Sequence, residues 1–468
     1  MTDGAKIAIH VCFALFVVVI WLSQDGATTL FVCGLAGLLT YGFLAITECF
    51  SSDDLITPLS YHFMWNTAVL GVAAVYFANR IAVPGSFGFG LFRYISAHDL
   101  ATGYLICVVG STIVHIMLRL TRAQPLEPKA PKRILHPIIG ILLFAAGAVV
   151  IIAPRGIMAL SGLPASIARE SPLAILLAIA FGPRTRKHYW LKLFSGTGFL
   201  VAANLLAFFP FKGAVLQSLF PLMIAAWKKS RTMAICLTLL VPVFYLGFLA
   251  PFVTASRAHE KANPLERFST VQSEEPVVKD KKANFDVFMV RIFDPIAAGY
   301  IYGQTRFYGF LWGDSMKNLE YAVVPRFLWP KKPDMSDAKW FTAYLGFPHM
   351  NSYTAMTAAG EMYWNFSVLG LTFGMIPVAL CLAIVWRVAE RLGKGTFFGG
   401  FFYATAIINS ANMGDAADAF LMLLTLAVTL APILLWPKLK GWTHWFFDPL
   451  MRPVQISDSP LAASKETR

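Results

Sequence analysis

Residues 7–23 read IAIHVCFALFVVVIWLS, a run without a formally charged side chain. As a helix, such a run reaches across most of the hydrocarbon layer of a bilayer, which is about 30 Å thick. Similar apolar runs follow at 28–49 and 233–254. Backbone polar groups find no water inside hydrocarbon, so spanning segments are helices or strands of a closed barrel. The apolar residues here are continuous rather than alternating, which excludes the barrel and predicts membrane helices.

Composition supports a membrane protein. The mean hydropathy is +0.61 and only 14% of the 468 residues are charged, which is too apolar for one soluble core. The formal net charge of +13 would suggest nucleic acid in a soluble protein, but the chain has no nucleic-acid motif and none is expected as a partner. The positive charge is instead expected to set the membrane topology. The six cysteines lie in or beside apolar runs, so we expect no disulfide framework.

The hydropathy pattern predicts an all-α, polytopic bundle of about twelve spans. We place them at 6–22, 28–48, 62–79, 100–118, 134–153, 170–183, 193–209, 213–227, 232–254, 362–386, 396–412 and 416–436. The first run lacks a small-residue cleavage site, so it is expected to remain as a span. The spans at 170–183 and 213–227 are short, which leaves tilted, broken or re-entrant helices as alternatives.

The basic residues predict the sidedness of these spans. Short connections of one parity hold fifteen lysines and arginines, while those of the other parity hold five. The richer side is expected to be cytoplasmic, with both termini. The chain then divides into nine spans in 1–254, an outer (periplasmic) loop at 255–361, three spans in 362–440 and a cytoplasmic tail at 441–468.

The long outer loop carries the most informative segment, Val324-Pro-Arg-Phe-Leu-Trp-Pro-Lys-Lys-Pro333. Its prolines exclude an ordinary helix and predict a stiff extended strap. The strap holds Arg326, Lys331 and Lys332 on the side where basic residues are uncommon, which favours an anionic ligand such as a phosphate. Contact of the two lysines with lipid head groups is the alternative.

Four other residues near this loop are candidates for a site. Arg291 and Arg306 lie in apolar or aromatic surroundings, where arginine usually has a specific partner. For Arg291 that partner is a ligand or Asp294, three residues on in a helix expected at 285–302. Glu361 is expected at the outer interface as a general base or as an acidic residue at a helix N-terminus. His349 is a second candidate base, although a structural histidine is the commoner case.

Other chemistry finds little support in the sequence. Asp53-Asp54 resembles the acidic pair of metal-using, lipid-sugar glycosyltransferases, but its predicted cytoplasmic side is wrong for that reaction. No metal-ligand spacing, P-loop, dinucleotide fingerprint or nucleophile elbow is present. We therefore expect neither a metal nor a cofactor.

The outer-loop segments resemble a known family. The strap at 325–333 and the segment Gly360-Glu-Met-Tyr-Trp-Asn-Phe366, followed by Gly370, are similar to motifs of bacterial O-antigen or exopolysaccharide repeat-unit polymerases. The many spans and the single long late loop also match that family. The related O-antigen ligases place a His-Asn pair ahead of the glutamate, and His349-Met-Asn351 departs from that spacing, which favours a polymerase.

The resemblance implies a GT-C-like glycosyltransferase in the bacterial inner membrane. It would join polyprenyl-diphosphate-linked oligosaccharides at the periplasmic face, beside membrane lipid and a chain-length regulator protein. The implied diphosphate-binding residues are Arg291, Arg306, Arg326 and Lys332. The implied bases are Glu361 and His349, and the implied sugar-stacking residues are Trp329, Trp340 and Tyr363.

Three rival classes remain beside the polymerase. A glycan flippase would also suit about twelve spans, but transporters often show two similar halves, and none are seen here. An O-antigen ligase shares the chemistry of the polymerase. An acyltransferase is the third alternative, and no His-centred motif in a span supports it.

Overall fold

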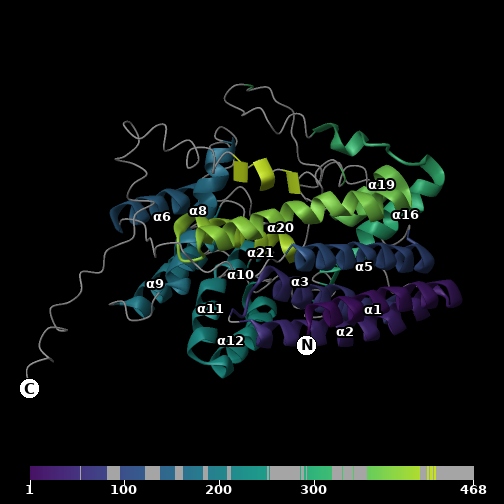
Figure 1. Cartoon of the computed structure of the whole chain (residues 1–468), viewed down its shortest axis with the longest axis horizontal. Coiled ribbons are helices and arrows are strands. Elements are labelled where there is room, and N and C mark those ends of the chain that lie inside the picture. Colours follow the sequence, from purple (N-terminus) through teal and green to yellow (C-terminus); the bar gives the residue numbers. More distant parts are fainter. Residues whose placement is uncertain are drawn as a thin grey trace, which may run out of the picture.

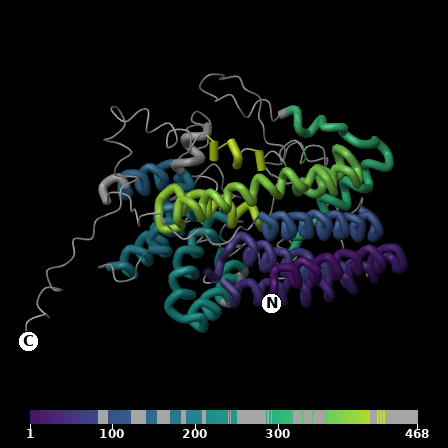
Figure 2. Tube along the Cα trace, viewed as in Figure 1, coloured from purple at the N-terminus to yellow at the C-terminus, as the bar shows by residue number. Residues whose placement is uncertain are grey.

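A computed structural model of the chain is helical throughout the part that it describes (Figure 1). That part comprises residues 1–52, 54–81, 95–121, 137–152, 162–182, 188–207, 212–249, 292–318 and 356–411, with short pieces at 252, 285, 289–290, 329, 341, 419–420, 422–424 and 426–427. The first helices of the chain, purple to dark blue in Figure 2, lie side by side along the long axis of the molecule.

The N-terminal helices form one packed bundle. Its members are α1 (Asp3–Ser23), α2 (Gly26–Ser51), α5 (Ala97–Leu120), and a consecutive trio of α3 (Pro58–Asn66), η1 (Thr67–Ala73) and α4 (Ala74–Ile81). Helices α1, α2 and α5 and the segment 358–392 are long and apolar enough to cross a membrane. Large apolar side chains on α1 and α2 are exposed, Leu22 to 71% and Leu39 to 74%, as lipid-facing side chains are.

Most of the remaining helices fall on further predicted spans, while the predicted span at 416–436 lies mostly outside the described residues. These helices are α6 (Pro137–Ile152), α8 (Gly162–Phe181), α9 (Tyr189–Leu206), α10 (Lys212–Gln217), α11 (Phe220–Lys229), α12 (Arg231–Phe244), η3 (Tyr245–Leu249), α20 (Met375–Leu392) and α21 (Phe397–Ala411). The short predicted span at 213–227 is broken into α10 and α11, one of the expected alternatives. The helical class is confirmed, whereas the count of twelve spans stays a prediction.

Side-chain caps fix where the first helices begin. Asp25 precedes α2 and accepts hydrogen bonds from the backbone N–H groups of Ala27 and Thr28 and from the Thr28 hydroxyl. These bonds, the hydroxyl of Thr28 first, lower the pKa of Asp25. Thr57 and Ser96 each form a capping box at the start of α3 and α5. Such caps satisfy helix N–H groups that have no partner within the helix.

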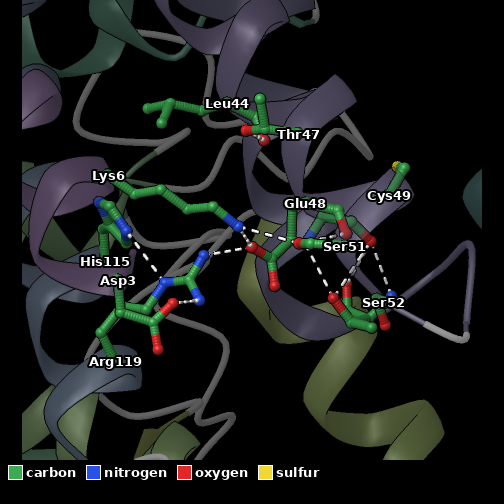
Figure 3. Close-up of polar contacts among 12 residues, drawn as sticks. Asp3, Lys6, Leu44, Thr47, Glu48, Cys49, Ser51, Ser52, His115 and Arg119 are labelled. Carbon is green, nitrogen blue, oxygen red and sulfur yellow. Dashed lines mark hydrogen bonds and ion pairs between the residues drawn. The ribbon is translucent and has the colours of Figure 1, made fainter. Parts of the chain in front are cut away.

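Buried charges join α1, α2 and α5 at one end of the bundle (Figure 3). The Glu48 carboxylate on α2 pairs with Lys6 of α1 at 2.7 Å and with Arg119 of α5. All three side chains are at most 2% exposed. Arg119 also pairs with Asp3, so two cations meet two anions. Buried charges are tolerated only when they are paired, so these contacts hold the three helices in register.

Further ion pairs lie at the same end of the molecule. Asp54, just after α2, pairs with Lys394 at 2.7 Å and with Lys228 at 3.7 Å. Both lysines lie in connections that the charge rule predicts to be cytoplasmic. We call this end, marked by Arg119, Lys228 and Lys394, the basic end. Its cytoplasmic side remains a prediction.

Helix α16 (Pro295–Tyr308), from the predicted outer loop, packs along one half of α5. A Cβ atom on Gly103 would lie 2.3 Å from the backbone of Gly299, so the two helices touch through their backbones. Arg306, near the end of α16, reaches Asp99 near the start of α5. Helix α16 therefore begins near the middle of α5 and runs towards the end opposite the basic end, here called the Arg306 end.

The start of this helix differs from the sequence-based expectation. One helix was expected at 285–302 with Asp294 inside it, but the described residues 285, 289–290 and 292 are helical ahead of a break at 293–294, and α16 then runs from Pro295 to Tyr308. Proline suits the first helical position because its missing N–H is not needed there. Asp294 therefore precedes the helix, and the expected pairing partner Arg291 lies outside the described residues.

The predicted span at 362–386 falls in a segment that is long and apolar enough to cross a membrane, but the chain reverses within it. Helix α19 (Ala358–Leu369) includes Phe366 and Ser367 in non-helical conformations, with Ser367 at φ 59°. A Cβ atom on Gly370 would lie 2.1 Å from the Met362 carbonyl oxygen, so η5 (Gly370–Gly374) folds back against α19. Helix α19 is thus a half-length helix beside α16, and η5 with α20 forms the rest of the apolar segment 358–392 (Figure 1).

We predict that Glu48→Gln destabilises the folded protein. The substitution leaves Lys6 and Arg119 buried with one anion fewer, and breaking a buried ion pair on one side costs about 3–5 kcal/mol. Thermal denaturation in detergent, followed by size-exclusion chromatography, measures the loss. Glu390→Gln is the control, because Glu390 is 39% exposed and makes only a weak pair with Lys394 at 3.8 Å. Equal thermal stability of the two variants would contradict the prediction.

A second prediction tests the α5–α16 contact. Alanine favours a helix over glycine by about 1 kcal/mol, so Gly→Ala in an open helix position stabilises. A Cβ atom added at Gly198 would have no neighbouring atom within 4 Å, and Gly198→Ala should keep or raise the melting temperature. Gly103→Ala should lower it, because the added methyl group meets the α16 backbone. A melting temperature for Gly103→Ala at or above wild type would rule out this packing.

Candidate functional site

The structure describes four of the nine predicted site residues. Arg306 lies on α16, and Glu361 and Tyr363 lie on the adjacent helix α19. Trp329 is 36% exposed. The other five lie outside the described residues, and their roles stay predictions: Arg291, Arg326, Lys332, Trp340 and His349. The packing of α16 against α19 therefore brings Arg306 close to the motif that contains Glu361 and Tyr363.

Arg306 is a half-exposed cation at the end of α16. Its Nη2 atom donates a hydrogen bond to the Tyr302 hydroxyl at 2.9 Å, and its guanidinium lies 4.5 Å from the centre of that ring. Asp99 is its ion-pair partner at 3.4 Å. The Tyr302 hydrogen bond first, and the charge of Asp99 after it, raise the pKa of Arg306. With its side chain 46% exposed, the cation is open to an anionic ligand.

Exposed aromatic rings follow Arg306 along the chain. Phe307, Tyr308 and Trp312 are 81%, 78% and 74% exposed, although aromatic side chains of this size usually pack. Tyr363 is buried beneath them, where its ring contacts Tyr302 and Phe310 edge-on or tilted. Flat exposed rings of this kind bind sugar faces or lie in a membrane interface.

Glu361 takes part in a clamp between α19 and the turn after α16. Its Oε1 atom accepts a hydrogen bond of 2.6 Å from the Ser315 hydroxyl. Asn365, one helical turn on, donates to Ser315 and to the Glu361 carbonyl, and its own amide oxygen accepts from the Gly313 N–H. Glu361 is only 1% exposed, so its carboxylate positions the turn that bears Trp312.

A polar cavity lies where α16 and α19 begin. Its volume is about 60 Å³, enough for more than one water molecule. Asp294 and Thr357 contribute from the starts of the two half-length helices, and Cys107 and Ser111 from the middle of α5. Counted along α5 from Asp99, Cys107 is about 12 Å inside the bundle. The cavity therefore lies deep among helices that are long enough to span a bilayer.

Hydrogen bonds orient the other polar residues of the cavity. The Nδ1 atom of His62 lies 2.7 Å from the Ser410 carbonyl oxygen, which can only accept, so this nitrogen carries a hydrogen. The Nε2 atom of His62 is left as an acceptor, 2.9 Å from the Ser111 hydroxyl. Asn66 donates to Ser111 at 3.1 Å and to the His62 carbonyl.

This cavity was not predicted from the sequence. The available signal was the presence of His62, Asn66 and Ser111 within apolar predicted spans, where polar side chains usually face a functional interior. Their convergence depends on the packing of α3, α5 and α21, which no local pattern specifies. Among the described residues, no three His, Cys, Asp or Glu side chains gather closely enough to hold a metal ion.

Comparisons with known proteins add no relative from which a role could be transferred. The chain matches no protein-family model, no curated protein and no solved structure.

Proposed function

We propose that this chain is a membrane glycosyltransferase that polymerises polyprenyl-diphosphate-linked oligosaccharides into a bacterial surface polysaccharide. The reaction takes place at the Arg306 end, which the charge rule predicts to face the periplasm. The observation that carries the proposal is the half-exposed Arg306 guanidinium at the end of α16, which is followed by exposed aromatic rings and packs against the helix that bears Glu361. The choice of a polyprenyl-diphosphate-linked substrate rests on the sequence resemblance to repeat-unit polymerases.

The proposed chemistry is a substitution at a sugar carbon. The anomeric carbon of the donor glycan loses its bond to the diphosphate oxygen and gains a bond to a hydroxyl of the acceptor glycan. The diphosphate leaves with the electron pair of the broken bond, and the acceptor hydroxyl gives its proton to a base. Arg306 stabilises the negative charge that grows on the diphosphate, and the exposed rings hold the sugars.

Glu361 is proposed as the base, and its burial sets a condition on that role. The carboxylate is bonded to Ser315 and is almost fully covered. Proton transfer therefore requires the turn that carries Ser315 to open when a glycan binds. Catalytic hydrogen bonds often form only in the complex with substrate, so the closed arrangement is compatible with a base.

A lipid-linked glycan flippase is the second candidate, and the cavity favours it. Many transporters bind their substrates near the bilayer midplane, where discontinuous helices begin. Helices α16 and α19 both begin at a polar cavity lined by Asp294 and Thr357. The two functions differ in product, because a flippase moves the lipid-linked glycan without lengthening it.

The reconstitution of activity separates these candidates. We expect the purified protein in nanodiscs to lengthen a polyprenyl-diphosphate-linked oligosaccharide without nucleotide sugar, ATP or added metal. Arg306→Gln should slow lengthening about a hundredfold, since a lost charge-assisted contact raises the barrier by about 2–4 kcal/mol. Lys317→Gln is the matched control, because Lys317 is an exposed cation at the same end that pairs with Asp314. Translocation without lengthening would favour the flippase.

A conservative variant tests Glu361. Glu361→Gln keeps an oxygen that can accept from Ser315, so the melting temperature should stay near that of wild type, but it removes the base. We expect lengthening to fall by about 10²–10⁴-fold. Ser315→Ala makes the complementary change, because it removes the hydrogen bond to Glu361 and leaves the carboxylate in place. If Glu361→Gln lengthens glycans at the wild-type rate, Glu361 is a structural residue only.

A further inference from the structure

We propose that a chain of buried, hydrogen-bonded side chains carries protons between the basic end of the bundle and the central cavity, where His62 and Asp294 receive them. The inference does not rest on the glycosyltransferase function. It rests on contacts among α1, α2, α3 and α5, none of which takes part in the Arg306 site except through Asp99.

The chain begins beside the ion pairs shown in Figure 3. The Nε atom of Arg119 donates to Nε2 of His115 at 3.4 Å. The Nδ1 atoms of His115 and His10 are 2.9 Å apart, so one of the two rings donates to the other. The Nε2 atom of His10 then lies 3.0 Å from the Tyr41 hydroxyl. These contacts link α5 to α1 and α1 to α2.

The second half of the chain leads into the cavity. The Tyr41 hydroxyl donates to the Ser111 hydroxyl at 3.4 Å, and Ser111 is 2.9 Å from Nε2 of His62. Because Nδ1 of His62 already donates to a carbonyl group, Nε2 is the nitrogen that can accept. Asp294 lies on the wall of the same cavity, which has room for water between the two groups.

The hydrogen-bonded chain extends over a large part of the thickness of a bilayer. Counted along α5, Arg119 and Ser111 are about 12 Å apart, and Arg119 and Cys107 about 18 Å apart. The hydrocarbon layer is about 30 Å thick. The chain and the cavity together therefore cover more than half of it, from the basic end inwards.

Every link can take up and release a proton. When the hydrogen bond from Arg119 opens, Nε2 of His115 accepts an incoming proton and another leaves from Nδ1 to His10. His10 passes one from Nε2 to Tyr41, Tyr41 passes its own to Ser111, and Ser111 passes its own to His62. Each group gains one proton and loses one, so no net chemistry occurs, and rotation of the hydroxyl groups and rings resets the chain. Arg119 holds its protons permanently, so it marks the entrance and is not a link.

The burial of three linked histidines favours proton transfer over a purely structural role. Histidines within membrane spans are costly and are commonly part of proton or ligand paths. His10 and His115 are 0% exposed and His62 is 4% exposed, yet they belong to one continuous chain. The other titratable groups that face it are Lys6, Glu48, Tyr104, Cys33 and Cys107. The Tyr104 hydroxyl donates to the carbonyl oxygens of Cys33 and Leu70, so it is not a member of the proton-carrying chain.

Proton flux into proteoliposomes tests the proposal. A potassium diffusion potential set by valinomycin drives protons inward, and an enclosed pH-sensitive dye reports them. We expect wild-type protein to conduct above protein-free liposomes, and His115→Phe to lower the protein-dependent flux at least about tenfold, since each 1.4 kcal/mol of added barrier is a factor of ten. His98→Gln is the control, because His98 is exposed on the same helix and stacks on Trp21 outside the chain.

A second variant keeps the test decisive if His115→Phe fails to fold. Asp294→Asn preserves the shape of the side chain and removes its ability to accept a proton, so it should also lower the flux while eluting as folded protein. Wild-type flux equal to that of empty liposomes would overturn the proposal, as would undiminished flux in folded Asp294→Asn. Glycan lengthening in detergent needs no gradient, so its presence or absence in wild-type protein tests the glycosyltransferase function separately.

Discussion

The pairing of Glu48 with both Lys6 and Arg119 is the constraint on which the N-terminal bundle depends. In an apolar environment an unpaired charge costs far more than a surface charge, so the three helices must meet at one register for any of these charges to be tolerated. That register places His10 within hydrogen-bond distance of both His115 and Tyr41. The ion pairs at one end therefore fix the polar interior further along the helices.

The second organising feature is the pair of half-length helices. Helix α16 approaches α5 through Gly103 and Gly299, where the absence of side chains lets the two backbones touch. Helix α19 begins beside Gly110 and ends where the backbone N–H groups of the 311–312 turn satisfy its last carbonyl groups. The backbone groups at these helix ends thus find hydrogen-bond partners within the protein, as backbone groups that are shielded from water must.

The sequence predicts the parts of this structure that depend on local pattern. The apolar runs at 6–22, 28–48 and 100–118 lie within α1, α2 and α5, because continuous hydrophobicity is sufficient to identify a long membrane helix. The reversal at Ser367 was missed because residues 362–386 are apolar on both sides of it, and hydropathy carries no information on direction. For the site, the glycine-glutamate motif was recognised by resemblance, but the Ser315 and Asn365 contacts that bury Glu361 depend on tertiary packing. The histidine chain was missed for the same reason, since its members come from separate helices.

The two sites are joined by the helices that run between them. Helices α16 and α19 have their first turns at the cavity with Asp294 and Thr357, and their last turns at Arg306 and Asn365. A helix of 14 residues is a rigid connection of about 21 Å. Glu361 lies in the first turn of α19, next to Ala358 and Ala359 of the cavity wall, and its bond to Ser315 therefore brings the turn after α16 back towards the cavity end of α19.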